Sequence, residues 1–199
     1  EIMMCLEMTD QVPFNTVYLH GLVRDEKGRK FSKTTGVGFD PLEMIEKYGA
    51  DALRMALVYE TAAGKDLHIN DDKIRAMRNF SNKIWNASRF VLLNETKVKS
   101  QKSKVKSENA DDKWILSELD KTTKTVTNSI EKYRFGQAAE IVYEFFWHVF
   151  CDKYIEKYKV KSQKSKVKSY WVLLYVLEIS LKLLHPFMPF ITEEIWQKI

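Results

Sequence analysis

The sequence has few of the residues that build metal sites, disulfide frameworks or membrane spans. Its 199 residues include only two cysteines, Cys5 and Cys151, far apart and with no Cys-x-x-Cys pair or histidine cluster around them. Such cysteines predict reduced thiols in a cytoplasmic protein and no protein metal site. The longest uninterrupted apolar run, Tyr170 to Leu177, is much shorter than the roughly 18 residues of a membrane helix. No signal peptide is visible, so no membrane partner is expected.

Acidic residues are missing from the two most basic stretches of the chain. The 11-residue string KVKSQKSKVKS occurs twice, at 97–107 and 159–169, and each copy holds five lysines. The net charge is +5, but without the two copies the chain holds 22 basic and 27 acidic residues. Because Lys, Ser and Gln cannot pack a core, both copies are predicted to be flexible loops. They are either basic arms that attract RNA or a repeat inserted into two tolerant loops.

The chain has enough apolar side chains for a core, 45% of all residues, and its patterns are mainly helical. Helices are expected over 1–9, Pro41–Tyr48, 50–60, from Asn70 or Asp71 to about Asn94, 111–133, 134–158, 170–184, and at the C-terminal end with Thr192 near the N-cap. A short buried strand is expected at Thr16–Leu19 and another near Gly38–Phe39. Four or five antiparallel helices form a bundle, so the predicted fold class is mainly α.

The segment GRKFSKTTGVGFDP, residues 28–41, combines cations, hydroxyl side chains and glycines. Its lysines and arginine among serine and threonine are suited to holding phosphate, and Gly36 and Gly38 allow a sharp turn or a close approach to a ligand. Asp40 followed by Pro41 predicts a helix N-cap. Taken alone, a K-x-S-K pattern is more typical of an ordinary solvated turn.

The helix expected over 71–94 has two different faces. The predicted core stripe is Ile74, Met77, Ser81, Ile84, Ser88 and Val91, flanked by Phe80 and Trp85. The neighbouring stripe, here called the Arg/Asn stripe, contains no acid and consists of Arg75, Arg78, Asn82, Asn86 and Arg89. Arg and Asn bind phosphates and base edges, so the Arg/Asn stripe is a candidate RNA-binding surface. A solvated face whose amides tie helices together is equally consistent with it.

Five ordered motifs together resemble the class I aminoacyl-tRNA synthetases. GRKFSKTTG resembles the KMSKS signature loop, with Lys30, Phe31, Ser32, Lys33 and Thr34 at its five positions. YGADALR (48–54) looks like the segment after this loop in the group specific for valine, isoleucine, leucine and methionine. RNFSNKIWNASRF and LLHPFMPFITEEIWQ are similar to the anticodon-binding bundle of that group. YLHGLVRDEKGRK and GKDLHINDDKIRAMRNFSNKIWNASRF resemble its valine-specific members most, and the motifs together are far more specific than any one.

The resemblance implies that residues 1–64 are the end of a Rossmann-type catalytic domain that carries the signature loop. Residues 65–199 would be an antiparallel α-helical anticodon-binding bundle, truncated at its C-terminal end, with lysine-rich loops at 97–107 and 159–169. The implied partners are ATP with Mg²⁺, valine and tRNA(Val), in a cytoplasmic, monomeric enzyme. Lys33, assisted by Lys30, would bind the ATP phosphates, Ser32 would shape the loop, and the Arg/Asn stripe would contact tRNA.

Three positions depart from the family pattern: Phe31 replaces the usual Met, Thr34 the final Ser, and Val37 the Asn after the glycine. The HIGH signature, the amino-acid pocket and the editing domain are expected upstream of Glu1, so this chain alone is expected to be inactive. Two alternatives stay open at this point: a segment of an isoleucine–tRNA ligase, or a tRNA-binding module without catalysis.

Overall fold

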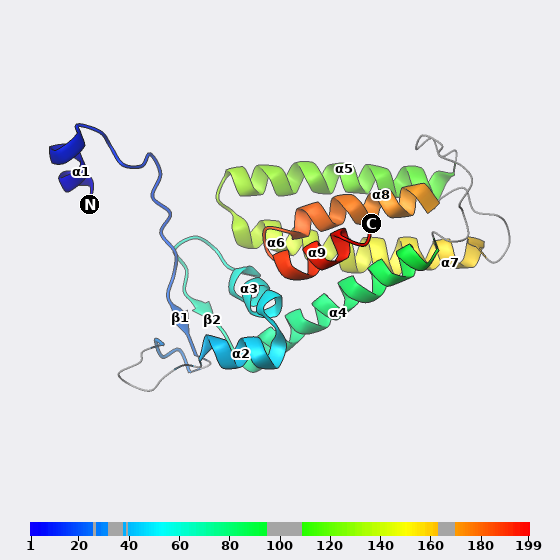
Figure 1. The fold of residues 1–199 in the computed structure, drawn as a ribbon, viewed down its shortest axis with the longest axis horizontal. Coiled ribbons are helices and arrows are strands. Elements are labelled where there is room, and N and C mark those ends of the chain that lie inside the picture. Colours follow the sequence, from blue (N-terminus) through cyan, green and yellow to red (C-terminus); the bar gives the residue numbers. More distant parts are fainter. Residues whose placement is uncertain (26, 32–37, 39, 95–108, 163–169) are drawn as a thin grey trace.

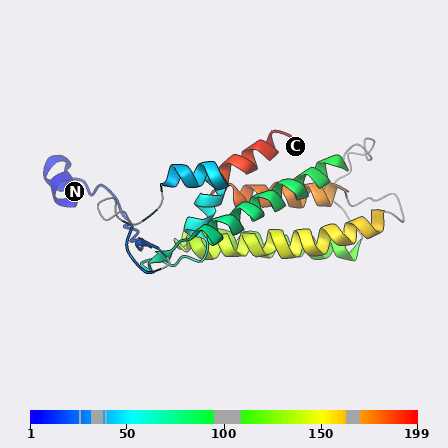
Figure 2. The same ribbon diagram turned by 90° about the horizontal axis from the view of Figure 1, so that it is seen from below.

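The computed structural model describes residues 1–25, 27–31, 38, 40–94, 109–162 and 170–199 (Figure 1). Its main body is a bundle of long helices, from which an N-terminal segment with the short helix α1 (Ile2–Thr9) extends (Figures 1 and 2). The bundle contains α4 (Asp71–Leu93), α5 (Ala110–Glu131), α6 (Phe135–Glu144), the π-helical segment η2 (Phe145–Ile155), α7 (Glu156–Ser162) and α8 (Tyr170–Leu184). The mainly α fold class is confirmed.

Local capping explains where several helices begin. Asp40 accepts a hydrogen bond from the Leu42 amide at 2.9 Å and starts α2 (Pro41–Tyr48). Asn70 accepts one from the Lys73 amide at 2.8 Å and starts α4. Each side-chain oxygen satisfies an amide that has no partner within its helix. Both predicted starts are confirmed.

The segments α6, η2 and α7 follow one another without a break and form one continuous helical rod. The predicted helix over 134–158 is therefore confirmed, with wider π-helical turns in its middle. Within η2, the residues Phe145, Phe146, Phe150, Cys151, Tyr154 and Ile155 are all buried. The aromatic side chains among them thus belong to the core.

Helix α3 (Ala50–Val58) belongs to the same core as the long helices, although the sequence assigns it to the first domain. Ala52, Leu53, Met55 and Ala56 are buried in the shared cluster. The helix packs against α4, α6 and the last helix, α9 (Pro189–Trp196). The boundary predicted at residues 64/65 therefore divides side chains that share one core.

The prediction of a buried strand at Thr16–Leu19 is wrong. Val17 and Leu19 are exposed, and the strands of the described chain are β1 (Val23–Arg24) and β2 (Leu67–His68), which pair in parallel. A strand forms only where a second strand can satisfy its backbone groups, and the Leu67 amide does so at Leu22. The strand expected near Gly38–Phe39 involves Phe39, which lies outside the described residues.

The second lysine repeat is not wholly a loop. Its first four positions, 159–162, form the end of α7. The Lys159 ammonium pairs with Glu156 at 2.6 Å and lies 5.2 Å from the centre of the Phe90 ring. These contacts continue the rod into the repeat, which composition alone could not predict. The first copy, at 97–107, and positions 163–169 lie outside the described residues.

The structure also differs from two further predictions, one on the core face of α4 and one on the start of α9. Phe80 is fully buried, whereas Trp85 is exposed and Ser81 lies at the edge of the core stripe. The Thr192 hydroxyl does not cap α9, because it donates to the carbonyls of Met188 and Pro189. None of the described helices has the length and apolar character needed to cross a membrane.

Candidate functional site

The signature loop starts from a hairpin-like turn that already uses one of its cations. Arg24 and Lys30 form an antiparallel bridge, and Asp25 accepts hydrogen bonds from the amides of Lys27 and Arg29 at 3.0 and 2.7 Å. The Arg29 guanidinium pairs with the same carboxylate at 2.7 Å. Lys30 is exposed, and its ammonium has no carboxylate partner in the described part of the chain. Of Arg29 and Lys30, the neighbouring cations at the start of the loop, Lys30 is therefore the one available to a ligand.

Ser32 and Lys33, the other two catalytic candidates, lie at 32–37, outside the described residues. The residues on either side of this gap are close together. Phe31 packs against the hydrophobic core, and a side chain at Gly38 would meet the Phe31 ring at 3.2 Å. Gly38 also has φ 132°, a conformation that favours glycine. The structure thus closes the base of the loop through the contact of Phe31 with Gly38.

Asp66 fixes the turn to the chain that follows Gly64. Its carboxylate accepts the Leu22 amide at 2.8 Å and Arg24 Nε at 2.5 Å. The Leu22 amide first, and the Arg24 guanidinium second, hold the pKa of Asp66 below its ordinary value. Both side chains are about one-third exposed, so the ion pair itself contributes little stability. Its role is to align β1 with β2.

Asp71 joins the helix behind the loop to the helix that bears the Arg/Asn stripe. At the start of α4, its carboxylate accepts hydrogen bonds from Lys47 Nζ at 2.6 Å and from the Tyr48 hydroxyl at 2.8 Å, both from α2. The bond from Lys47 and then that from Tyr48 lower the pKa of Asp71. The carboxylate therefore stays ionised at neutral pH and holds α2 against α4.

Asp51 makes the corresponding link from α3 to α9. It is 7% exposed, and its two oxygens accept the amides of Phe190 and Ile191 at 3.3 and 2.6 Å. From the same helix, Arg54 donates to the Pro186 carbonyl at 3.2 Å. A carboxylate at a helix N-terminus satisfies free amides and complements the helix dipole. Asp51 is thus the N-terminal cap of α9.

Sequence patterns named Asp71 only as a possible start of its helix and did not single out Asp51. Asp51 lies in the quoted YGADALR motif, but its partners are 139 and 140 positions away. The partners of Asp71 are 24 and 23 positions away. Capping patterns are read over a few neighbouring residues, so only the fold reveals these two contacts.

The structure brings the whole Arg/Asn stripe onto one exposed face of α4. The five positions follow the spacing of three and four residues that places side chains on one side of a helix, and all five are exposed: Arg75, Arg78, Asn82, Asn86 and Arg89. Arg75 pairs with Asp72 at 2.6 Å. Arg78 and Arg89 have no carboxylate partner among the described residues. These two guanidinium groups are free to bind phosphate.

No group of three or more His, Cys, Asp and Glu side chains in the described ranges could hold a metal ion. His148 is flanked on its helix by Glu144 and Asp152, at 3.9 and 3.2 Å. All three side chains are about half exposed. Exposed contacts of this kind have low energetic weight.

Two family models match separate parts of the chain. Residues 1–70 match the model described as tRNA synthetases class I (I, L, M and V). Residues 112–199 match the model described as the anticodon-binding domain of tRNA ligase. The first match contains the signature loop, and the second contains most of α5 and the rest of the bundle to α9.

Similar curated proteins extend over nearly the whole chain. Valine–tRNA ligase of Bacillus cereus (strain ATCC 10987) is 48% identical over 199 residues, and that of Clostridium tetani is 50% identical over 194 residues. These matches cover 98% and 95% of this chain but 23% and 22% of the two relatives. The chain therefore spans less than a quarter of the length of these relatives.

Solved structures give the same fold. The LeuRS of Agrobacterium radiobacter K84, in a ternary complex with tRNA and LeuAMS, superposes with a TM-score of 0.77 and 26% identity over 99% of this chain and 24% of that chain. Methionyl-tRNA synthetase of Mycobacterium tuberculosis, in complex with methionyl-adenylate, gives a TM-score of 0.73 at 21% identity over 89% of this chain and 36% of that chain. The second likeness shows the shared fold alone.

Proposed function

Because the chain belongs to the class I aminoacyl-tRNA synthetases, we propose that it is a segment of a valine–tRNA ligase. The observation that carries this proposal is the 48% identity to valine–tRNA ligase over 98% of the chain, which includes both the signature loop and the bundle. The reaction attaches valine to tRNA(Val) through a valyl-adenylate, with ATP as the second substrate. We place this activity in a monomer in the cytoplasm.

The signature loop supplies positive charge to the first step. When the valine carboxylate attacks the α-phosphate of ATP, the bond to pyrophosphate breaks and negative charge accumulates on the departing phosphates. A lysine brought to these oxygens stabilises the transition state more than the bound ATP. Lys33 has this role, Lys30 assists it from the exposed end of the turn, and Ser32 shapes the loop. Mg²⁺ arrives with the nucleotide phosphates.

The Arg/Asn stripe supplies the tRNA contact. Arg78 and Arg89 are exposed cations without carboxylate partners in the described ranges, and Asn82 and Asn86 lie between them on the same face. Guanidinium groups hold phosphates, while amide side chains hydrogen-bond to base edges. The hydrogen bonds of Asp71 with Lys47 and Tyr48 fix this helix relative to α2, which follows the signature loop.

Titration of this chain with tRNA(Val) tests the proposed tRNA contact. We expect binding that weakens steeply with salt, and we expect Arg78→Ala and Arg89→Ala each to reduce the slope of log affinity against log salt by about one. Lys121→Ala, which removes a lysine paired with Glu118 on α5, is the matched control. A further variant lacks both lysine repeats. If that variant loses all binding while Arg78→Ala and Arg89→Ala change nothing, the Arg/Asn stripe is only solvated surface.

A further inference from the structure

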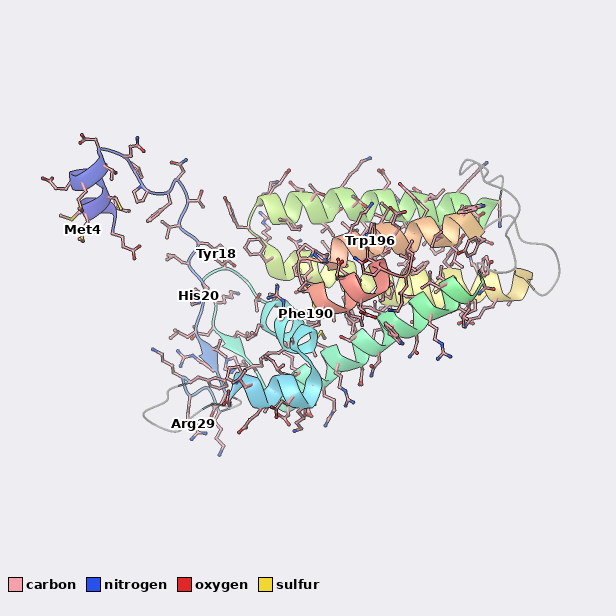
Figure 3. The ribbon with its side chains drawn as sticks, in the orientation of Figure 1. Met4, Tyr18, His20, Arg29, Phe190 and Trp196 are labelled. Carbon is pink, nitrogen blue, oxygen red and sulfur yellow. The ribbon has the colours of Figure 1, made fainter. Side chains whose placement is uncertain are left out.

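A second group of cations, separate from α4, lies where α5 turns into α6. These cations line a cleft of about 670 Å³, here called the turn cleft. One wall comes from the N-terminal segment and includes Tyr18, and another comes from the loop between Thr61 and Gly64. The third wall is the α5–α6 turn, with Lys132, Tyr133 and Arg134. Figure 3 shows Tyr18 on the N-terminal segment, beside the end of the bundle.

Close backbone contacts build the turn cleft. At Gly136, in the first turn of α6, a Cβ atom would lie 2.0 Å from the Thr61 carbonyl oxygen. Only glycine lets the loop approach α6 so closely. On the opposite side, the Gly64 amide donates to the Leu19 carbonyl at 3.0 Å. The loop is therefore held on both sides.

Tyr133 occupies a backbone position that normally belongs to glycine. Its φ is 56°, and it follows the end of α5 in a Schellman motif, in which the amides of Tyr133 and Arg134 donate to the carbonyls of Ile130 and Ser129. A left-handed backbone conformation is energetically unfavourable for tyrosine but not for glycine. Such strain often marks a functional position.

Tyr133 is 45% exposed, so burial does not account for the strain. Its centre lies 6.4 Å from that of Tyr18 and 6.1 Å from that of Phe135. Tyr18 is itself 40% exposed. The two tyrosines thus present aromatic surface at the turn cleft.

The charges around the turn cleft favour an anion. Its lining contains Lys132 and Arg134 and no acidic residue. Neither cation has a carboxylate partner within the part of the chain that is described. Helix α6 begins at this point, and the side chain of its N-cap residue, Arg134, makes no capping hydrogen bond. The first-turn amides and the positive end of the helix dipole add to the two side-chain charges.

We propose that the turn cleft binds a nucleotide unit of RNA, with its base stacked on Tyr133 and its phosphate held by Lys132, Arg134 and the first amides of α6. An exposed aromatic ring beside cations is the usual surface for an unstacked base and its phosphate. The assignment of this RNA as tRNA depends on the function proposed above. Within that function, the turn cleft is a second contact at the end of the bundle nearest β1 and β2 (Figure 1).

The central experiment replaces Tyr133 with glycine, which removes the ring and the backbone strain together. We expect Tyr133→Gly to bind tRNA(Val) about tenfold more weakly, with a melting temperature that is unchanged or higher. Tyr133→Phe keeps the ring and should bind as the unchanged chain does. Lys132→Ala and Arg134→Ala should each reduce the salt slope by about one, whereas Lys113→Ala, at the far end of α5, should not.

A second measurement does not need tRNA. Titration of the isotope-labelled chain with the dinucleotide ApA should shift the amide resonances of Gly136 and Gln137, and Tyr133→Gly should abolish the shift. If these resonances do not move and Tyr133→Gly binds tRNA(Val) normally, the proposal is overturned. A response to AMP without a response to ApA or tRNA overturns the RNA assignment. If ApA shifts the resonances but the unchanged chain binds no tRNA, the turn cleft stands and the proposed tRNA function fails.

Discussion

At the scale of single residues, Lys33 carries the most specific chemical role that we assign. In a full-length polypeptide that contains this chain, Lys33→Ala should slow valyl-adenylate formation by about 100-fold. ATP affinity in the ground state should change little, because the lost contact forms mainly with the departing pyrophosphate. ATP–pyrophosphate exchange at varied ATP concentration measures both quantities.

The matched control for Lys33 is Lys27, an exposed lysine in the turn before the loop. Lys27→Ala removes the same charge six positions away and should leave the exchange rate nearly unchanged. Equal ATP–pyrophosphate exchange rates for Lys33→Ala and the unchanged enzyme would show that Lys33 does not act in the catalytic step.

Residues differ in how far their roles can be predicted from sequence. Lys30 and Lys33 belong to a short ordered motif, so the roles proposed for them rest on the neighbouring residues in the sequence. The role proposed for Tyr133 depends on a left-handed backbone angle, and the capping by Asp51 depends on partners far along the chain. Neither the backbone angle nor the distant partners can be inferred from the neighbouring residues in the sequence. The turn cleft could not be predicted for the same reason.

At the scale of elements, the helices were predictable and the strands were not. A helix satisfies its backbone within one segment, so caps such as Asn70 and a period of 3.6 residues are sufficient to locate α4. A strand depends on a distant partner. Val17 and Leu19 have suitable side chains, but the backbone that pairs with β1 is β2, at Leu67.

Helix α9 depends on α3 for its stability, and Asp51→Ala tests this dependence. Eight residues are too few for a stable isolated helix. Removing a buried carboxylate that accepts two amides should lower the free energy of unfolding by about 2–3 kcal/mol. Asp120→Ala is the control, because Asp120 is an exposed acid paired with Lys124 on α5, and its loss should cost less than about 0.5 kcal/mol.

Urea unfolding of the two variants gives the comparison. Amide exchange at Phe190 and Ile191 reports locally, and it should accelerate in Asp51→Ala more than in Asp120→Ala. Equal losses of stability in the two variants would mean that α9 is held by its apolar contacts alone.

At the scale of the whole molecule, the chain is organised around one core that crosses the expected domain boundary. The net charge of +5 arises from the two lysine repeats, so it carries no information about how the core is organised. The core cluster runs from Met44 in α2 to Ile195 in α9. By contrast, α1 has no buried residue.

The shared core predicts which fragments fold by themselves. Residues 41–199 keep α2 and α3 and should unfold cooperatively at nearly the temperature of the whole chain. Residues 65–199 lose α3, in which Leu53 and Met55 are 6% and 0% exposed. Burial of side chains of this size stabilises by about 2 kcal/mol each, and the Asp51 cap of α9 is lost with them. Because a domain of this size is stable by only about 5–15 kcal/mol, we expect no cooperative transition in the shorter fragment.

Circular dichroism melting and calorimetry of both fragments provide the measurement. A cooperative transition of residues 65–199 near that of residues 41–199 would show that α4 to α9 form a self-sufficient core, with α3 only attached to its surface.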